Sequence, residues 1–304
     1  MLSLAPIVLF AYARPEHLRQ TLNALCLNPL ADQSDLIVYA DAARSEKDSE
    51  AVQAVRELIR GISGFRSVLL IERTTNFGLA RNIIEGVSEV LRQNERVIVL
   101  EDDMVTAPFF LIYMNEALER YANDDRVISI HGYVYPVAGA LPEAFFLPGA
   151  DCWGWATSRR GWACFNSDGA KLLQELKQRK LERAFDYDGN YPYTKMLEAQ
   201  VVGKNDSWAI RWYASAFLLG KLTLYPGRSL VHNIGNDATG THCDQSSVMN
   251  TSLSQRPISL DGVAVESCIA ARLEIARFFG RQSSRGMAGW ISRLLSSFAM
   301  ERAA

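Results

Sequence analysis

The chain has 304 residues, of which 48% are hydrophobic, so it can bury the core of one large domain or of two smaller ones. Its 32 basic and 34 acidic residues give a net charge of −2, which argues against nucleic acid as a main partner. The five cysteines include no C-x-x-C pair, so a disulfide framework or zinc knuckle is not expected and a reducing cytoplasm fits best. No apolar run approaches the ~20 residues that a membrane-spanning helix needs.

The first half of the chain alternates short apolar runs with amphipathic stretches. The N-terminal run lacks a preceding basic region, so we interpret it as a first strand rather than a signal peptide. Strands are expected at 6–12, 35–42, 67–73 and 97–101, with helices after them. This rhythm predicts an α/β fold with a mainly parallel sheet flanked by helices on both faces. Ligands of such sheets bind at the carboxyl ends of the strands.

The second half has a different pattern. Residues 126–135 and 144–158 are expected to be strands, and a polar helix is expected at about 168–180. The Tyr-rich segment FDYDGNYPYTK comes before NDSWAIRWYASAFLLG, whose apolar residues have helical spacing. The segment KLTLYPGRSLVHNIGNDATGTH follows. From Arg281 onward, apolar residues share one helical face beside several arginines. That amphipathic helix either lies in a membrane interface or packs on protein.

Three acids, Glu101, Asp102 and Asp103, directly follow the strand at 97–101. If the strand continues, side chains alternate, so Glu101 and Asp103 point one way and Asp102 the other. Mg²⁺ and Mn²⁺ are bound by one or two carboxylates together with phosphate oxygens and water, so a cation would relieve this repulsion and neutralise a diphosphate. The alternative is that the acids cap a helix that begins near Ala107–Pro108.

The stretch VIVLEDDMVTAPFFLIYMNEAL resembles the acidic-motif region of the animal Golgi N-acetylglucosaminyltransferase I family. TTNFGLARNI resembles the N-x-G…R-N segment of family 2 glycosyltransferases, GADCWGWATSRRGW a G-x-G-W stretch, and NDSWAIRW the W-D-D-W stretch that carries the base. The resemblance runs in order over residues 5–245. It implies the GT-A fold, a single nucleotide-binding α/β domain, and an inverting transferase that uses Mn²⁺ and a UDP-sugar.

On the metal side, the resemblance makes Asp103 the direct metal ligand. Glu101 and Asp102 match positions that contact the hydroxyls of the donor sugar and the ribose. His232 is a candidate second ligand, because imidazole suits Mn²⁺ and related folds place a histidine after the last core strand. Its alternative is a histidine that is hydrogen-bonded in the core.

On the nucleotide side, Asp41 matches an acid that hydrogen-bonds the base in such folds. Ala11, Tyr12 and Arg14 match the loop after the first strand, against which the base and ribose lie. Arg81 matches a basic position near the nucleotide, and its alternative is a surface arginine at a helix start.

An inverting transferase needs a carboxylate that takes the proton of the acceptor hydroxyl. Asp206 in NDSWAIRW is the candidate base, although the acid that pairs with it in the family is Asn205 here. Asp206 could instead be only the N-cap of the helix that follows. Asp186 and Asp188 are reserve candidates, and Asp151 is a further acid that could contact sugar.

Two other features near these motifs bear on substrate binding. Gly235 and Gly240 make the loop between His232 and His242 pliable, and we expect this loop to fold over the donor and exclude water. Arg159 and Arg160 could meet a diphosphate or an anionic acceptor, but ordinary surface arginines are the preferred interpretation.

Several enzyme classes are excluded by missing motifs. There is no G-x-G-x-x-G after the first strand, no P-loop and no G-x-S-x-G elbow. Two alternatives to a transferase remain: a sugar nucleotidyltransferase, for which the first loop lacks the expected glycine, and a catalytically idle nucleotide-sugar-binding or scaffolding protein.

The expected organisation is a nucleotide-sugar-binding half at 1–125, an acceptor-binding and catalytic half of the same domain at 126–245, and a C-terminal helical extension at 246–304. The expected partners are a nucleotide sugar and a glycan or lipid-linked acceptor, as in cell-surface polysaccharide or lipopolysaccharide synthesis. We expect a cytoplasmic protein that has peripheral membrane contact if residues 281–304 lie in the interface.

Overall fold

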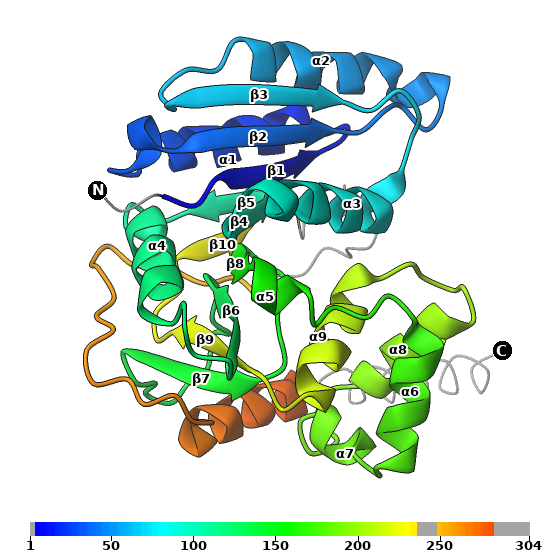
Figure 1. Ribbon diagram of the computed structural model, residues 1–304, viewed down its shortest axis with the longest axis vertical. Coiled ribbons are helices and arrows are strands. Elements are labelled where there is room, and N and C mark those ends of the chain that lie inside the picture. Colours follow the sequence, from blue (N-terminus) through cyan, green and yellow to red (C-terminus); the bar gives the residue numbers. More distant parts are fainter. Residues whose placement is uncertain (1–3, 236–247, 283–304) are drawn as a thin grey trace, which may run out of the picture.

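In the computed structural model, which describes residues 4–235 and 248–282, the centre of the molecule is an eight-stranded sheet (Figure 1). Its strand order is β3-β2-β1-β4-β8-β6-β9-β7. Strands β8 and β7 run against the other strands, so the sheet is mainly parallel. This confirms the predicted α/β class with helices flanking a large, mainly parallel sheet.

The first half of the chain builds the all-parallel end of this sheet. Every residue of β1 is buried because strands pair with it on both sides and helices cover both faces. Helix α1 begins at Pro15, whose missing N–H is not needed in the first turn. The elements in chain order are β1 (Ile7–Ala11), α1 (Pro15–Cys26), β2 (Asp35–Ala40), α2 (Ser49–Arg60), β3 (Ser67–Glu72), α3 (Gly78–Gln93) and β4 (Arg96–Glu101).

The second half completes the sheet and adds a group of helices beside it (Figure 1). The strand expected over 144–158 is in fact two strands, because the chain turns between them at positive φ angles of Gly149 and Gly154. The strand expected at 126–135 ends at His131. The elements are β5 (Met104–Thr106), α4 (Phe110–Arg120), β6 (Val127–His131), β7 (Ala144–Pro148), β8 (Trp155–Ser158), α5 (Arg159–Trp162), α6 (Gly169–Gln178), α7 (Glu182–Phe185), α8 (Tyr193–Val201), α9 (Trp208–Leu218), β9 (Leu222–Pro226) and β10 (Val231–Asn233).

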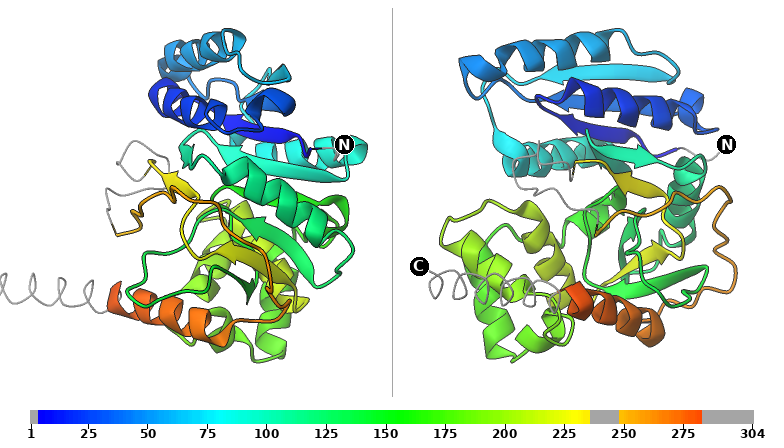
Figure 2. Two further views of the ribbon diagram at one scale, coloured as in Figure 1. Left: turned by 90° about the vertical axis from the view of Figure 1, so that its left-hand side faces the viewer. Right: turned by 180° about the vertical axis from the view of Figure 1, so that it is seen from behind.

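Two hydrophobic cores lie on the two faces of the sheet, and helices cover both faces (Figure 2). The apolar sides of α1, α2 and α4 form the first core with one face of the strands. Helices α3, α5 and α9 form the second core, which contains Trp155, Trp162, Trp208 and Trp212 in mutual ring contact. Residues from both halves of the chain therefore enter both cores.

The described part of the C-terminal region runs along the far end of the sheet. Residues 251–266 form no regular helix or strand, and the chain touches β7 through the bridge between Phe146 and Ser267. Residues 269–282 are helical. The amphipathic stretch expected from Arg281 lies, except for its first two residues, outside the described residues. Within the described ranges, no helix is long and apolar enough to cross a bilayer.

Candidate active site at the carboxyl ends of β1 and β4

The strand order reverses between β1 and β4. Strands β2 and β3 extend the sheet on one side of β1, whereas β4 lies on its other side. In open α/β sheets, ligands bind in the crevice outside the carboxyl ends of the strands at such a reversal. The register pairs Phe10 with Glu101, so the residues after β1 lie beside the residues after β4. The topology therefore places a ligand site where the three acids lie.

The acid cluster, which we define as Glu101, Asp102 and Asp103, lies on a turn. β4 ends at Glu101, and Asp102 and Asp103 turn the chain into β5. The alternation expected for a continuing strand does not apply, because the chain leaves the main sheet here and β5 pairs with β10. The acids do not cap a helix near Ala107–Pro108 either, since α4 begins only at Phe110.

Arg14 bridges the two aspartates of the cluster. Its Nη2 lies 2.5 Å from Oδ1 of Asp102 and 2.7 Å from Oδ2 of Asp103. These aspartate side chains are only 5% and 8% exposed. The second oxygen of Asp102 accepts a hydrogen bond from the Tyr12 backbone N–H (3.2 Å), and the Asp102 carbonyl accepts one from the Thr21 hydroxyl (2.8 Å). The segment after β1 thus supplies a cation and hydrogen bonds to charges that are almost withdrawn from water.

One arginine does not neutralise three carboxylates. Burial, and then the charges of Asp103 and Asp102, raise the pKa of Glu101 to about 8. Burial likewise raises the pKa of Asp102 to about 6. The two aspartates raise the pKa of Arg14 against the opposing effect of burial, so the guanidinium stays charged. The Glu101 carboxylate accepts no hydrogen bond from a described residue. At neutral pH the site therefore keeps an excess of negative charge that Arg14 alone does not balance.

The chain passes directly over Asp103 after β10. The Ile234 N–H donates to the Asp103 carbonyl (2.9 Å), and the Gly235 N–H donates to Oδ1 of Asn233 (2.7 Å). A Cβ at position 235 would overlap Oδ2 of Asp103 and would lie 2.9 Å from Nη1 of Arg14. Only glycine permits this close approach without displacing the carboxylate. Most of the loop expected to fold over a donor, residues 236–242, lies outside the described residues.

The carboxylates fit a divalent cation that binds together with a diphosphate. Oδ1 of Asp103 is buried and has no hydrogen-bond partner among the described residues, which is costly for a carboxylate oxygen unless a ligand reaches it. Among the described residues, however, no three His, Cys, Asp or Glu side chains are grouped closely enough to hold a metal by themselves. Phosphate oxygens and water would have to complete the coordination, as is usual for Mg²⁺.

His232 lies on β10 opposite Val105 of β5, and it is half-buried. Burial lowers the pKa of its imidazole, which favours the neutral form that binds metals. Its Nδ1 is buried and has no partner in the part of the chain that the structure describes, so the alternative of a core histidine hydrogen-bonded there does not describe it. Its role as a second metal ligand stays a prediction.

Asp41 is engaged by the start of α3. Its Oδ1 accepts hydrogen bonds from the N–H groups of Ala42 and Phe77, and its Oδ2 accepts them from the Gly78 N–H and the Asn76 amide, all at 2.9–3.2 Å. A carboxylate has about four acceptor positions, so these contacts use them all. Contact with a nucleotide base, as the resemblance implies for Asp41, would require one of these bonds to be released.

The other predicted nucleotide-binding residues surround the same edge. Ala11 is the buried last residue of β1, and the Tyr12 hydroxyl donates to Asp48 (2.9 Å), which fixes the loop after β2. Arg81 lies in the first turn of α3, where its guanidinium covers the ring of Phe77 at 3.8 Å. The structure thus brings together the residues after β1, β2 and β4 and the start of α3.

Asp206 does not cap helix α9, which was the alternative interpretation of this residue. Ser207 is instead the N-cap of α9, because its hydroxyl oxygen accepts a hydrogen bond from the Ile210 backbone N–H. The Asp206 side chain is 75% exposed and accepts a hydrogen bond from Arg211 (3.0 Å). Trp208, the first residue of α9, stacks on Trp155 with the ring centroids 5.4 Å apart. Trp155 in turn pairs with Val99, which lies two residues before the end of β4. Asp206 therefore lies two residues before a tryptophan that packs on the neighbour of β4.

The reserve candidates for a base already hold other segments. Asp186 accepts hydrogen bonds from the N–H (2.6 Å) and hydroxyl (2.8 Å) of Thr194 at the start of α8. Asp188 forms an ion pair with Arg272 in the C-terminal helix. Asp206 and Asp188 are both ion-paired, but the Asp206 side chain is 75% exposed against 44% for Asp188, which favours Asp206 as the more accessible carboxylate.

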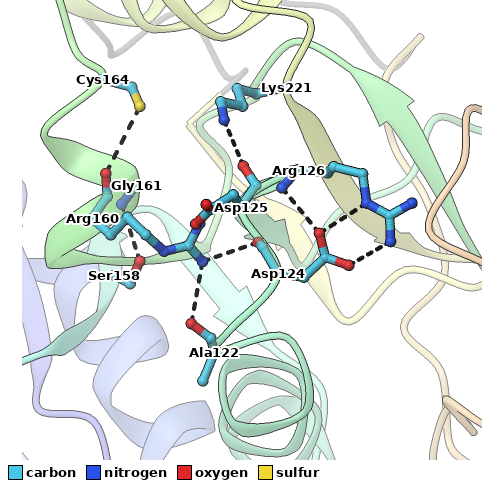
Figure 3. Close-up of polar contacts among 9 residues, drawn as sticks. All are labelled: Ala122, Asp124, Asp125, Arg126, Ser158, Arg160, Gly161, Cys164 and Lys221. Carbon is cyan, nitrogen blue, oxygen red and sulfur yellow. Dashed lines mark hydrogen bonds and ion pairs between the residues drawn. The ribbon is translucent and has the colours of Figure 1, made fainter.

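Arg159 and Arg160 lie at the other end of β4. Arg160 donates to the Asp125 carboxylate (2.7 Å) and to carbonyl groups of the turn after α4 (Figure 3). Arg159 donates to the Leu91 carbonyl (2.7 Å) at the end of α3. The preceding residue, Ser158, pairs with the first residue of β4. Both arginines therefore stabilise loops and do not face the acid cluster.

Sequence reasoning missed two residues of this site. Thr21 is completely buried on the inner face of α1, and its polar side chain between Leu18, Leu22 and Leu25 was the signal that could have revealed it. The sequence identifies Gly235 only as part of a pliable loop. That this glycine passes over Asp103 is seen only in the structure.

Comparisons with known proteins give only distant similarities. No protein-family model matches the chain, and no curated protein matches it. A crystal structure of S. aureus TarS 1–349 has a TM-score of 0.41 at 11% identity, over 76% of this chain and 61% of that one. A second TarS structure has a TM-score of 0.43 at 11% identity, over 77% and 37%. A cytidylyltransferase from Leptospira borgpetersenii serovar Hardjo-bovis has a TM-score of 0.32 at 9% identity, over 54% and 63%. Scores this low carry no argument about function.

The buried acid cluster predicts an unusual pH dependence of stability in the absence of ligands. The folded-state pKa of Glu101 is about 8 and its ordinary value is 4.5, so the unfolded state ionises first as the pH rises. Glu101 therefore contributes a loss of stability that develops between pH 4.5 and 8. Glu101→Gln should show a melting temperature that exceeds that of the wild type increasingly across this range. A difference that is constant with pH would contradict the raised pKa of Glu101.

Proposed function

We propose that the chain is a metal-dependent inverting glycosyltransferase that moves a sugar from a nucleoside-diphosphate sugar, with UDP favoured, to a hydroxyl of a glycan or lipid-linked acceptor. The observation that carries the proposal is the acid cluster at the reversal between β1 and β4, with an unpartnered buried oxygen on Asp103. A diphosphate alone would be repelled there, whereas a diphosphate with a divalent cation supplies the missing positive charge.

The proposed reaction is a single displacement. The acceptor oxygen forms a bond to the anomeric carbon of the donor while the bond from that carbon to the diphosphate oxygen breaks. The acceptor proton passes to Asp206, and the nucleoside diphosphate leaves with the bonding electrons. A bound Mn²⁺ or Mg²⁺ supplies neutralisation of the charge that develops on the diphosphate.

The chain's own residues have distinct roles in this proposal. Asp103 holds the cation, with His232 as a candidate second ligand. Glu101 and Asp102 accept hydrogen bonds from hydroxyl groups of the donor sugar and ribose. In the absence of the cation, Arg14 partly neutralises the two aspartates. Asp206 suits a base because its carboxylate is exposed and is oriented by one hydrogen bond from Arg211.

The biological setting follows only from the sequence. Synthesis of a cell-surface polysaccharide or lipopolysaccharide fits a cytoplasmic protein whose residues 281–304 could contact a membrane surface. A nucleotidyltransferase would instead take a nucleoside triphosphate and a sugar phosphate and would release diphosphate, and an idle binding protein would turn over neither substrate. Analysis of products after incubation with each substrate set separates the three.

Nucleotide binding should depend on the cation. Isothermal titration calorimetry with UDP, GDP, dTDP and CMP is expected to show one diphosphate that binds at least about tenfold more tightly with Mn²⁺ than without it. Asp103→Ala should remove this metal dependence, because it deletes the unpartnered oxygen. Asp32→Ala is the matched control, since Asp32 is exposed before β2, at the opposite edge of the sheet. Equal affinity with and without metal in the wild type would contradict the proposal.

Loss of the base should separate transfer from binding. Asp206→Asn keeps the shape and removes the proton acceptor, so transfer should fall by about 10²- to 10⁴-fold while nucleotide affinity stays unchanged. Asp188→Asn, at a reserve candidate that is already ion-paired, should retain transfer. If Asp206→Asn lost nucleotide binding, or kept normal transfer, the role assigned to Asp206 would be wrong.

A further inference from the structure

Only one of the two oxygens of the Asp151 carboxylate accepts hydrogen bonds from the described residues. Asp151 lies in the loop between β7 and β8, and its Oδ2 accepts hydrogen bonds from the hydroxyls of Tyr135 (2.7 Å) and Tyr225 (3.2 Å). Its Oδ1 has no partner among the described residues and is not one of their fully buried unpartnered atoms, so it is at least partly accessible to solvent. Two acceptor positions of a firmly oriented carboxylate therefore remain open to a ligand.

This open oxygen belongs to a loop that borders the acid cluster. Because β8 runs antiparallel to β4 and Trp155 pairs with Val99, the loop that precedes β8 crosses the carboxyl end of β4. Burial, together with the charges of Asp151, Glu101 and Asp103, raises the pKa of the Cys152 thiol well above its ordinary value. Cys152 is thus close enough to Asp151 and to the acid cluster to feel the charges of both.

Two aromatic side chains accompany Asp151 at the surface. Trp153 is partly exposed and makes an edge contact with Tyr133 at 4.8 Å. Tyr191 is also partly exposed, lies near Asp151 and Cys152, and packs on Tyr193. The Tyr191 hydroxyl has no hydrogen-bond partner among the described residues and is not one of their fully buried unpartnered atoms. Aromatic faces beside open hydrogen-bonding groups are the composition of a small-molecule site.

The backbone holds this arrangement in place. Gly154 has a positive φ of 60°, which turns the loop into β8, and its carbonyl accepts the Gly132 N–H at 2.7 Å. The Trp153 N–H donates to Nε2 of His131 (3.1 Å). Burial lowers the pKa of His131 to about 4, so this nitrogen stays an acceptor at neutral pH. A ligand would therefore meet a preorganised loop.

We propose that Asp151, Trp153 and Tyr191 form the subsite for the acceptor sugar, with Oδ1 of Asp151 accepting its hydroxyl protons and an aromatic ring packing against its apolar face. The subsite takes a neutral sugar, because Asp151 and the acid cluster together repel a carboxylate on the acceptor. This inference rests on the proposed function. It assigns Asp151 to binding and leaves proton removal to Asp206.

The test measures glycoside binding on the full chain by saturation-transfer NMR with UDP and Mn²⁺ present. The probes are methyl β-D-glucopyranoside, methyl β-D-galactopyranoside, methyl β-D-mannopyranoside and the uronic acid counterpart of each. At least one neutral glycoside should bind, and its uronic acid should bind at least about tenfold more weakly. Asp151→Ala and the milder Asp151→Asn should each weaken the neutral glycoside at least about tenfold. Tyr191→Phe should weaken it less, and Asp32→Asn should change nothing.

Calorimetry with UDP and Mn²⁺ shows whether each variant keeps its donor site and is folded. Unchanged nucleotide affinity with lost glycoside binding supports the subsite. Equal glycoside affinity of wild type and Asp151→Asn, equal affinity for a neutral glycoside and its uronic acid, or no binding of any glycoside by wild type would overturn it. If wild type binds glycosides through Asp151 but binds no nucleoside diphosphate, the subsite stands and the proposed transferase function fails.

Discussion

Three acidic side chains follow one another at the end of β4, two of them almost buried, and the cost of ionising all three there is the constraint on which this edge of the molecule depends. The segment after β1 offsets part of this cost, because the reversal of strand order brings that segment beside the end of β4. Arg14 bridges two of the acids, and the Tyr12 N–H supports one of them. The remaining excess of negative charge is what a cation and its diphosphate would balance.

The same constraint explains why the chain leaves the main sheet at this point. A continuing strand would direct the acids to opposite faces of the sheet, and one face is filled by α3 and the other by α1. The turn at Asp102 and Asp103 instead directs both carboxylates to Arg14, and the short pairing of β5 with β10 brings Gly235 over Asp103. The closing edge of the site is therefore supplied by a segment more than 120 residues away in sequence.

The parallel half of the fold was predictable because its signals are local. Continuous apolar runs placed four strands within two residues of their observed bounds, and Pro15 marked the start of α1. The position of the acids at a strand end was predictable for the same reason. The resemblance singled out Arg14 near the nucleotide, but its ion pairs with Asp102 and Asp103 join residues 88 and 89 positions apart.

Other features depended on contacts that no local pattern reveals. The capping role suspected for Asp206 belongs to Ser207, one residue further on, because a single backbone rotation decides which side chain reaches the first turn. The sequence offers Asp151 as an acid that could contact sugar, whereas the two tyrosines that orient it come from residues 16 and 74 positions away. Motif spacing can identify such residues, but only the packed chain shows which of their atoms remain open.

The most direct test of this account is the anomalous diffraction of manganese in crystals grown with Mn²⁺ and UDP. The account predicts a manganese peak at ligand distance from Oδ1 of Asp103, with the diphosphate on its far side and with Arg14 no longer bridging both aspartates. A peak elsewhere in the molecule, or a nucleotide bound without metal while Arg14 still joins Asp102 to Asp103, would contradict it.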